Sequence, residues 1–172
     1  MKHYFRRRTR ISILAFLTIT LLATVGIASR LPQDSAEDAV RSVLTQSATA
    51  FERGDMTAME KLWANDESVT VFESGHANYG WADYRDRHLG PEMKEMKNTK
   101  YSLSDIRVKV SGNTAWATFK YAISADIGTR HIESGGLGTA VLEKRGDDWR
   151  IVHWHSSAPR RAPTPSPTPA KN

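Results

Sequence analysis

The chain has 172 residues, no cysteine and a formal net charge of +5, and its length suits one domain flanked by short tails. The excess positive charge is confined to the ends. Residues 29–159 carry sixteen Lys and Arg against nineteen Asp and Glu, which excludes the basic surface typical of nucleic-acid-binding domains. The lack of cysteine excludes disulfides, so the core must be stable without them.

Residues 1–28 have the composition of an export signal. Five basic side chains precede Ile11–Ala28, a run of eighteen residues without a charge. Gly26 and Ala28 are small residues suited to a cleavage site. The same run would span about 27 Å as a helix, so a retained signal anchor is an alternative. Both alternatives predict a domain outside the cytoplasm (periplasmic, secreted or membrane-anchored), with only this segment touching the membrane.

Three helices are predicted in the first half of the domain. The first begins with a capping box at Asp34 and Glu37 and stops at Gly54. The second begins at Asp55 or Thr57 and carries apolar residues up to Trp63. A short strand at residues 68–72 and a loop at residues 73–80 follow. The third helix is expected over residues 81–89, because Gly90-Pro91 would end it.

The second half alternates apolar and polar residues with a period of two. Four strands are predicted at residues 101–110, 114–124, 135–145 and 149–157, separated by Gly, Asn and Asp turns. Helices followed by a meander indicate an α+β domain over residues 33–157, with three helices packed on a strongly curved antiparallel sheet. The glycines of residues 134–138 suggest a bulge or bend in a strand.

The last fifteen residues, 158–172, alternate proline with small polar residues. Such a segment cannot bury enough apolar area to fold, so we expect a disordered tail.

Two stretches carry a family resemblance. "FERGDMTAMEKLWANDESVTVF" resembles the helix–Gly-Asp–helix–strand opening of the nuclear transport factor 2-like superfamily, and "DDWRIVHWHSS" resembles its closing strand. Within this cystatin-like group the chain is most similar to SnoaL-like and ketosteroid isomerase-like proteins. The resemblance implies a cone with an internal pocket, often a homodimer formed through the outer sheet face, and a function as isomerase, dehydratase, hydrolase, binder or assembly module.

The closing strand holds the first candidate site residues, His153 and His155. Strict alternation along a strand would place both on the same side as Trp149 and Ile151. A histidine with a pKa near 6.5 can exchange protons at neutral pH, so both are candidates for acid–base chemistry or ligand contact. The alternation does not say which side faces the helices.

Other candidates precede that strand in the sequence. The expected pocket-lining residues are Glu73, His76, Trp81, Tyr84 and His88. Trp81, Tyr84 and His88 share one stripe of the predicted third helix, where the two aromatic residues also suit packing on the sheet.

Three interpretations remain open on the sequence. The first is an exported pocket protein that binds a small molecule, with isomerase, cyclase or lyase chemistry through histidines and no cofactor. The second is a non-catalytic dimerising binding or assembly module. The third is a zinc or copper site that combines His153 and His155 with His76, His88 or a glutamate. The histidines can also be structural groups that only satisfy hydrogen bonds.

Overall fold

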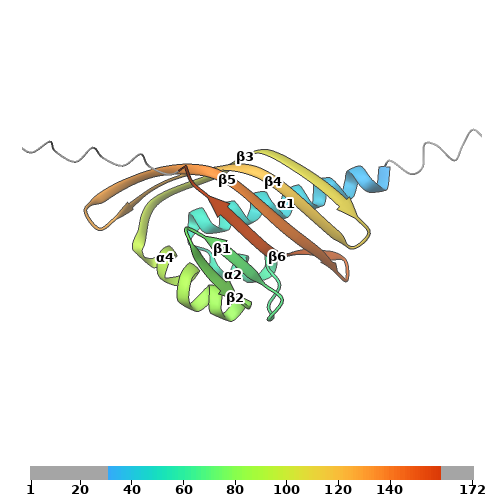
Figure 1. Cartoon of the computed structure of the whole chain (residues 1–172), viewed down its shortest axis with the longest axis horizontal. Coiled ribbons are helices and arrows are strands. Elements are labelled where there is room, and N and C mark those ends of the chain that lie inside the picture. The colour runs from blue at the N-terminus through green and yellow to red at the C-terminus, as the bar shows by residue number, and fades with distance from the viewer. Residues whose placement is uncertain (1–30, 160–172) are drawn as a thin grey trace, which may run out of the picture. The chain divides into compact units, whose positions relative to one another are not determined.

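The computed structural model describes residues 31–159, and the predicted leader and the tail beyond Pro159 lie outside this part. Helices come first and long strands last (Figure 1). The helical elements are α1 (Leu31–Arg53), α2 (Met56–Leu62), α3 (Trp81–Tyr84), the π-helical turn η1 (Arg85–Leu89) and α4 (Gly90–Glu95). The strands are β1 (Thr70–Glu73), β2 (His76–Tyr79), β3 (Met96–Ser111), β4 (Thr114–Ile127), β5 (Arg130–Arg145) and β6 (Asp148–Ser157). Residues from Ala36 onward belong to one compact unit.

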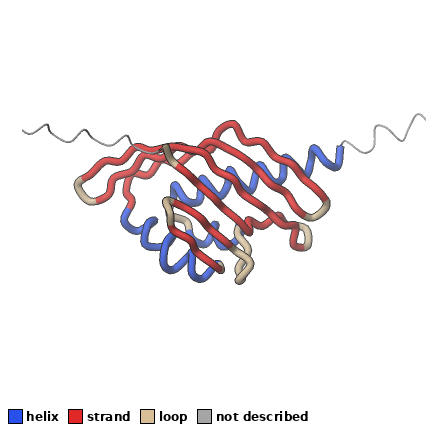
Figure 2. The backbone as a smooth tube through the Cα atoms, viewed as in Figure 1, coloured by secondary structure: helices blue, strands red, loops and turns tan. Residues whose placement is uncertain are grey.

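The six strands form one open sheet in the order β2-β1-β6-β5-β4-β3, and the helices pack on it (Figure 2). This confirms the α+β class. All neighbouring strands are antiparallel except β1 and β6, which run parallel, so the sheet is mixed rather than wholly antiparallel. The parallel pair arises because β1 returns from the helices beside the last strand of the meander. Among residues 31–159 no helix combines the length and apolar character needed to cross a bilayer.

The first two helices follow their sequence signals closely. α1 ends at Arg53, and Gly54 adopts a φ of +66°, which favours glycine. The Asp55 carboxylate then caps α2 by accepting the Ala58 backbone N–H at 2.9 Å. The start of α1 was predicted at Asp34 but lies at Leu31, so the expected capping box falls inside the helix.

The segment predicted as a loop after β1 is a β-hairpin. Ser74 and Gly75 have φ values of 52° and 82°, and Glu73 pairs with His76 across them. Positive φ at both central residues matches the right-handed twist of a two-residue hairpin. The prediction was wrong because β2 has only four residues and no β-branched side chain to mark it.

The third helix also differs from its prediction, since it continues through Gly90-Pro91 to Glu95. Proline inside an α-helix removes one backbone donor and clashes with the carbonyl four residues earlier. Here the chain widens into η1, where the Gly90 N–H bonds to the Arg85 carbonyl. A Cβ on Gly90 would lie 2.7 Å from that oxygen, so glycine allows the turn and the turn accommodates the proline.

One irregularity decides which face the closing histidines occupy. In the β5–β6 ladder Val141 pairs with His153 but Leu142 pairs with Ile151, so Val152 is an extra residue in a β-bulge. A bulge inverts the alternation beyond it. Ile151 and Trp154 therefore face the helices, and the predicted grouping of Ile151 with His153 is wrong.

The glycines of residues 134–138 do not form a bulge, because the β4–β5 register is continuous through them. A Cβ on Gly138 would come within 2.1 Å of the Phe119 ring. The glycine therefore lets that ring lie flat on the neighbouring strand.

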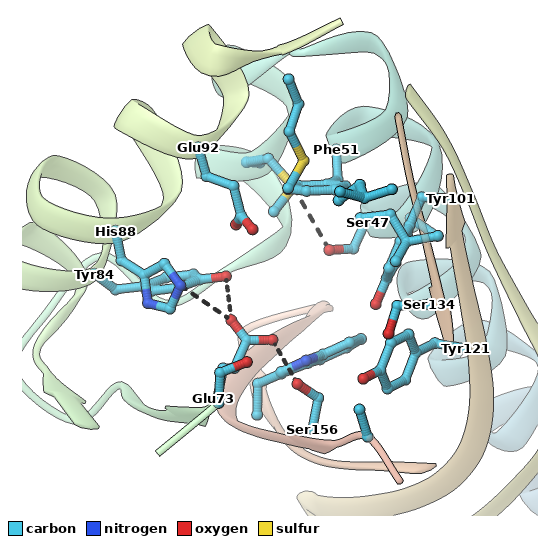
Figure 3. A pocket seen from close by; sticks show the side chains of 18 of the residues that line it. Ser47, Phe51, Glu73, Tyr84, His88, Glu92, Tyr101, Tyr121, Ser134 and Ser156 are labelled. Carbon is cyan, nitrogen blue, oxygen red and sulfur yellow. Dashed lines mark hydrogen bonds and ion pairs between the residues drawn. The ribbon is translucent and has the colours of Figure 1, made fainter. Parts of the chain in front are cut away.

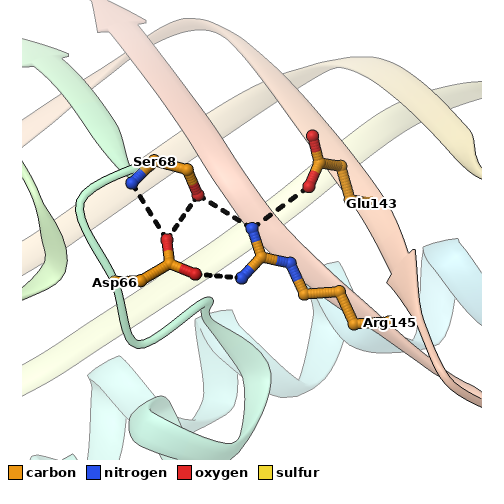
Figure 4. Close-up of polar contacts among 4 residues, drawn as sticks. All are labelled: Asp66, Ser68, Glu143 and Arg145. Atoms are coloured by element: carbon orange, nitrogen blue, oxygen red, sulfur yellow. Dashed lines mark hydrogen bonds and ion pairs between the residues drawn. The ribbon is translucent and has the colours of Figure 1, made fainter.

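The loop between α2 and β1 is held to β5 by a polar cluster (Figure 4). The Asp66 carboxylate accepts hydrogen bonds from the backbone and hydroxyl of Ser68, at 2.9 and 2.5 Å, and from Arg145. Arg145 also bonds Glu143 at 3.1 Å. The two Ser68 bonds, reinforced by Arg145, lower the pKa of Asp66 to about 2. This cluster fixes the loop from which β1 enters the sheet.

Candidate functional site

A cavity of about 210 Å³ lies between the helices and the inner face of the sheet (Figure 3). This volume is below the roughly 300 to 1,000 Å³ of pockets for drug-sized ligands, so the cavity suits a smaller molecule. Its apolar lining comes from α1, α2 and the Trp63 that follows it, β3, β4, β5 and β6. Its polar lining residues are Ser47, Glu73, Ser74, Tyr84, His88, Glu92, Tyr101, Tyr121, Ser134 and Ser156.

Glu73 lies at the point where β1 and β6 meet. The register pairs it with Ser156, whose hydroxyl donates to the Glu73 carboxylate at 2.9 Å. The Tyr84 hydroxyl donates to its other oxygen at 3.5 Å. Burial, followed by the charge of Glu73, raises the pKa of Tyr84 well above its ordinary value, so Tyr84 stays a neutral donor. The carboxylate is thereby held at the cavity wall.

His88 is oriented by a chain of polar side chains behind it. The Asn78 amide nitrogen donates to Asp83 at 3.0 Å, and the Asn78 oxygen lies 2.9 Å from His88 Nδ1. The hydrogen bond from Asn78, followed by one from the Tyr79 backbone, lowers the pKa of Asp83, so this carboxylate accepts and never donates at neutral pH. Asn78 must therefore present its oxygen to His88, and His88 Nδ1 must carry a hydrogen.

The other ring nitrogen of His88 faces the site. Nε2 lies 3.9 Å from the Glu73 carboxylate. In the neutral ring Nε2 holds a lone pair, because the proton is on Nδ1. The arrangement is thus a base on the cavity wall, with a carboxylate close enough to stabilise its protonated form.

Glu92 is the acidic group on the helical side of the cavity, and Figure 3 shows its carboxylate directed inward. Burial, then the charge of Glu73, raises its pKa to about 7. No hydrogen bond or ion pair is found for this carboxylate within residues 31–159. Glu92 was not among the predicted site residues, because the third helix was expected to end at Gly90. A helix continued past Pro91 places Glu92 four residues beyond His88, on the same stripe.

Three of the predicted pocket residues, Glu73, Tyr84 and His88, line this cavity together. Trp81 does not line it. It is buried against Trp63, with ring centroids 5.7 Å apart, and packs the helix on the core. His76 is exposed at the rim of the hairpin, with its ring 6.3 Å from that of His88.

His153 and His155 lie on the opposite face of the sheet and do not line the cavity, because the bulge at Val152 turns them outward. His153 Nδ1 is 2.7 Å from the Thr70 hydroxyl, and its ring meets Phe72 edge-on at 5.5 Å. Burial, then the neighbouring His155, lowers the pKa of His153. His155 is exposed beside a shallow hollow that includes His76. Across the described part of the chain no three potential metal ligands cluster closely enough to hold an ion.

Comparison with known proteins places the chain in a family. Residues 40–161 match the family model of the SnoaL-like domain. No curated protein matches the sequence.

Solved structures share the fold at low identity. A nuclear transport factor 2-like superfamily protein from Salmonella enterica has a TM-score of 0.70 and 18% identity, over 78% of this chain and 99% of that one. A protein from Streptomyces avermitilis proposed to be a dehydratase has a TM-score of 0.67 and 22% identity, over 74% and 98%. One from Shewanella frigidimarina proposed to be a ketosteroid isomerase has a TM-score of 0.61 and 23% identity, over 69% and 94%. With the family model matching most of the folded part, the chain belongs to the SnoaL-like family.

Proposed function

We propose that the cavity binds a small molecule and moves a proton on it, in isomerase or lyase-type chemistry. The observation that carries this proposal is the orientation of His88, whose Nε2 lone pair faces the cavity beside the Glu73 carboxylate. A positioned base of this kind contributes about 10² to 10⁴ in rate.

The roles follow from the geometry. His88 Nε2 takes a proton from a carbon next to a carbonyl group of the ligand. The C–H electron pair forms the C=C bond of an enolate, and the C=O π pair moves onto the oxygen. Glu73 stabilises the imidazolium that forms. Tyr101 lines the opposite wall, and burial followed by the charge of Glu73 raises its pKa, so its hydroxyl remains a hydrogen-bond donor for the developing oxyanion.

The test is exchange of carbon-bound hydrogen with deuterium oxide, followed by proton NMR for a panel of small ketones. Wild-type protein is expected to accelerate exchange for at least one ketone, and His88→Gln is expected to lower that rate by about 100-fold or more. The matched control His155→Gln, on the outer face, is expected to leave the rate unchanged. Exchange no faster than in buffer for every ketone, or equal rates for wild type and His88→Gln, would sink the proposal.

A second candidate function, assembly through the outer sheet face, is favoured by a separate observation. Four large hydrophobic side chains are exposed there: Phe72, Tyr79, Trp116 and Leu137, at 39, 63, 46 and 62%. Large hydrophobic side chains exposed on one sheet face are typical of interaction sites. The occupant we propose is a second copy of the chain, and such a dimer would leave the inner cavity open.

We also propose that the domain works outside the cytoplasm. The support is the basic and then uncharged composition of residues 1–28. Sequencing the N-terminus of protein isolated from its cells tests this. A start near Ser29 is expected for a cleaved signal, and an intact Met1 on protein recovered in the cytosolic fraction would contradict export.

A further inference from the structure

The cavity is lined by two carboxylates and by His88, and it has no permanently cationic side chain among the described residues. Glu73 of β1 and Glu92 of α4 both line it, and no Lys or Arg is among the lining residues in the described part of the chain. Two carboxylates without a cationic side chain give the cavity a negative potential when both are ionised.

The walls carry a large share of aromatic surface. On one side Tyr101 meets Phe51 edge-on at 5.0 Å and stacks with Tyr121 at 6.2 Å. On the other side Trp63 lies 5.1 Å from Tyr84 and 6.1 Å from Trp154. All six rings line the cavity. Aromatic faces attract cations through their quadrupole, most strongly where water is excluded.

The Glu92 carboxylate lacks the partner that the other partly buried carboxylates have. Glu73 accepts from Ser156 and Tyr84, and Glu52 accepts from the Tyr101 backbone and Lys100. Glu92 has no such contact within residues 31–159, although burial opposes its charge. A buried charge without a partner is costly, so this position favours a partner that enters with the ligand.

We propose that the ligand of this cavity is a small organic cation, a protonated amine or quaternary ammonium, held between Glu73, Glu92 and the aromatic walls. The proposal rests on the pocket of the proposed function and names its ligand class. An organic cation is favoured over a metal ion because no group of three potential metal ligands forms in the described residues. The cavity of about 210 Å³ limits the ligand to a small molecule.

The experiment compares choline with 3,3-dimethylbutan-1-ol, a neutral molecule of nearly the same shape, by isothermal titration calorimetry at pH 8. Choline is expected to bind at least about tenfold more tightly, because carboxylates and aromatic faces attract its trimethylammonium group and not the tert-butyl group of the alcohol. Glu92→Gln is expected to remove most of that preference. Glu95→Gln is the matched control, since it removes the same charge from an exposed position of α4 outside the cavity.

The pH dependence gives a second readout, because choline keeps its charge at every pH. The titratable groups around Glu92 are Glu73 of β1, Tyr84 of α3, His88 of η1, Glu95 of α4 and Tyr101 of β3. Choline affinity is expected to rise severalfold between pH 6 and pH 8 as Glu92 ionises, and Glu92→Gln is expected to flatten this rise.

Three results would overturn the organic cation as the ligand. Equal or tighter binding of the neutral alcohol would overturn the cation while leaving a small-molecule pocket in place. Choline binding that neither Glu92→Gln nor Glu73→Gln weakens would also overturn it. If neither compound binds at millimolar concentration the ligand class is rejected, and the deuterium-exchange result stands independently of it.

Discussion

At the scale of single residues, Glu92 links the cavity to the stability of the fold. Its folded pKa of about 7 lies above the ordinary 4.5, so the folded state holds this proton more tightly than the unfolded state. The stabilising contribution is complete below pH 4.5 and is lost as the pH rises towards 7. Glu92→Gln cannot lose a proton, so we expect it to be more stable than wild type at pH 8, by about 1 to 3 kcal/mol.

Urea unfolding at pH 5 and pH 8 measures this difference. The gain from Glu92→Gln is expected at pH 8 and to shrink towards zero at pH 5, where wild-type Glu92 is protonated in the folded state. Equal gains at both pH values would mean that the carboxylate does not titrate in this window.

We expect Asn78 to set the position of the proton on His88. Removing the Asn78 oxygen with Asn78→Ala takes away the acceptor that holds the hydrogen on Nδ1, so the population of the Nε2–H tautomer is expected to increase. Side-chain ¹⁵N NMR of the histidines distinguishes the two tautomers. Because Asn78 is buried, a loss of about 1 to 3 kcal/mol of stability accompanies the change.

His153 provides the internal control for this measurement, since it bonds Thr70 on the other face of the sheet and its spectrum should not move. An unchanged His88 tautomer in Asn78→Ala would show that Asp83 and Asn78 hold the ring in place without setting its proton.

At the scale of elements, the π-helical turn η1 is the feature that brings both His88 and Glu92 to the cavity. Gly90→Ala would place a methyl group 2.7 Å from the Arg85 carbonyl, closer than such atoms approach. We expect a loss of about 1 to 3 kcal/mol, as for other overpacked sites, together with weaker ligand binding. Thermal unfolding measures the first effect. Lys94→Ala, at an exposed position of α4, is the control and should change stability by less than about 0.5 kcal/mol.

The elements that the sequence predicted well are those with strong local signals. Asp55 capped a helix, Gly54 ended one, and four alternating runs became β3 to β6. The elements it missed carry no such signal. The hairpin at Ser74-Gly75 is too short to show a period, and a proline inside a helix is tolerated only because of the π-helical turn.

The presence or absence of a local sequence signal also explains which residues of the cavity were predicted. Glu73, Tyr84 and His88 were predicted because they lie at the end of a strand or on one helical stripe, and they line the cavity. Glu92 was missed with the end of its helix. Strict alternation grouped His153 and His155 with Ile151 and left their sheet face open, and a bulge at Val152 breaks that grouping. The bulge is seen in the pairing with β5 and not in a local sequence pattern around Val152.

At the scale of the whole described unit, the sheet separates two kinds of surface. The inner face carries the cavity with its carboxylates and His88, and the outer face carries exposed apolar side chains beside His153 and His155. The cavity and the exposed apolar side chains of the outer face have no residue in common. Catalysis and assembly can therefore be tested by separate substitutions.

The outer face gives the last prediction. If a second copy covers it, burying Trp116 and Leu137 contributes strongly, because large apolar side chains at the centre of an interface dominate its affinity. The double variant Trp116→Lys, Leu137→Lys places four like charges at a two-fold interface, two from each chain. We expect the wild-type protein to sediment as a dimer and the double variant as a monomer, in sedimentation velocity at about 10 to 50 μM. Both side chains are solvent-exposed in the single chain, so the melting temperature of the monomer should change little. Thr45→Lys, on the exposed side of α1, should remain dimeric, and a wild-type protein that sediments as a monomer at 50 μM would refute the interface.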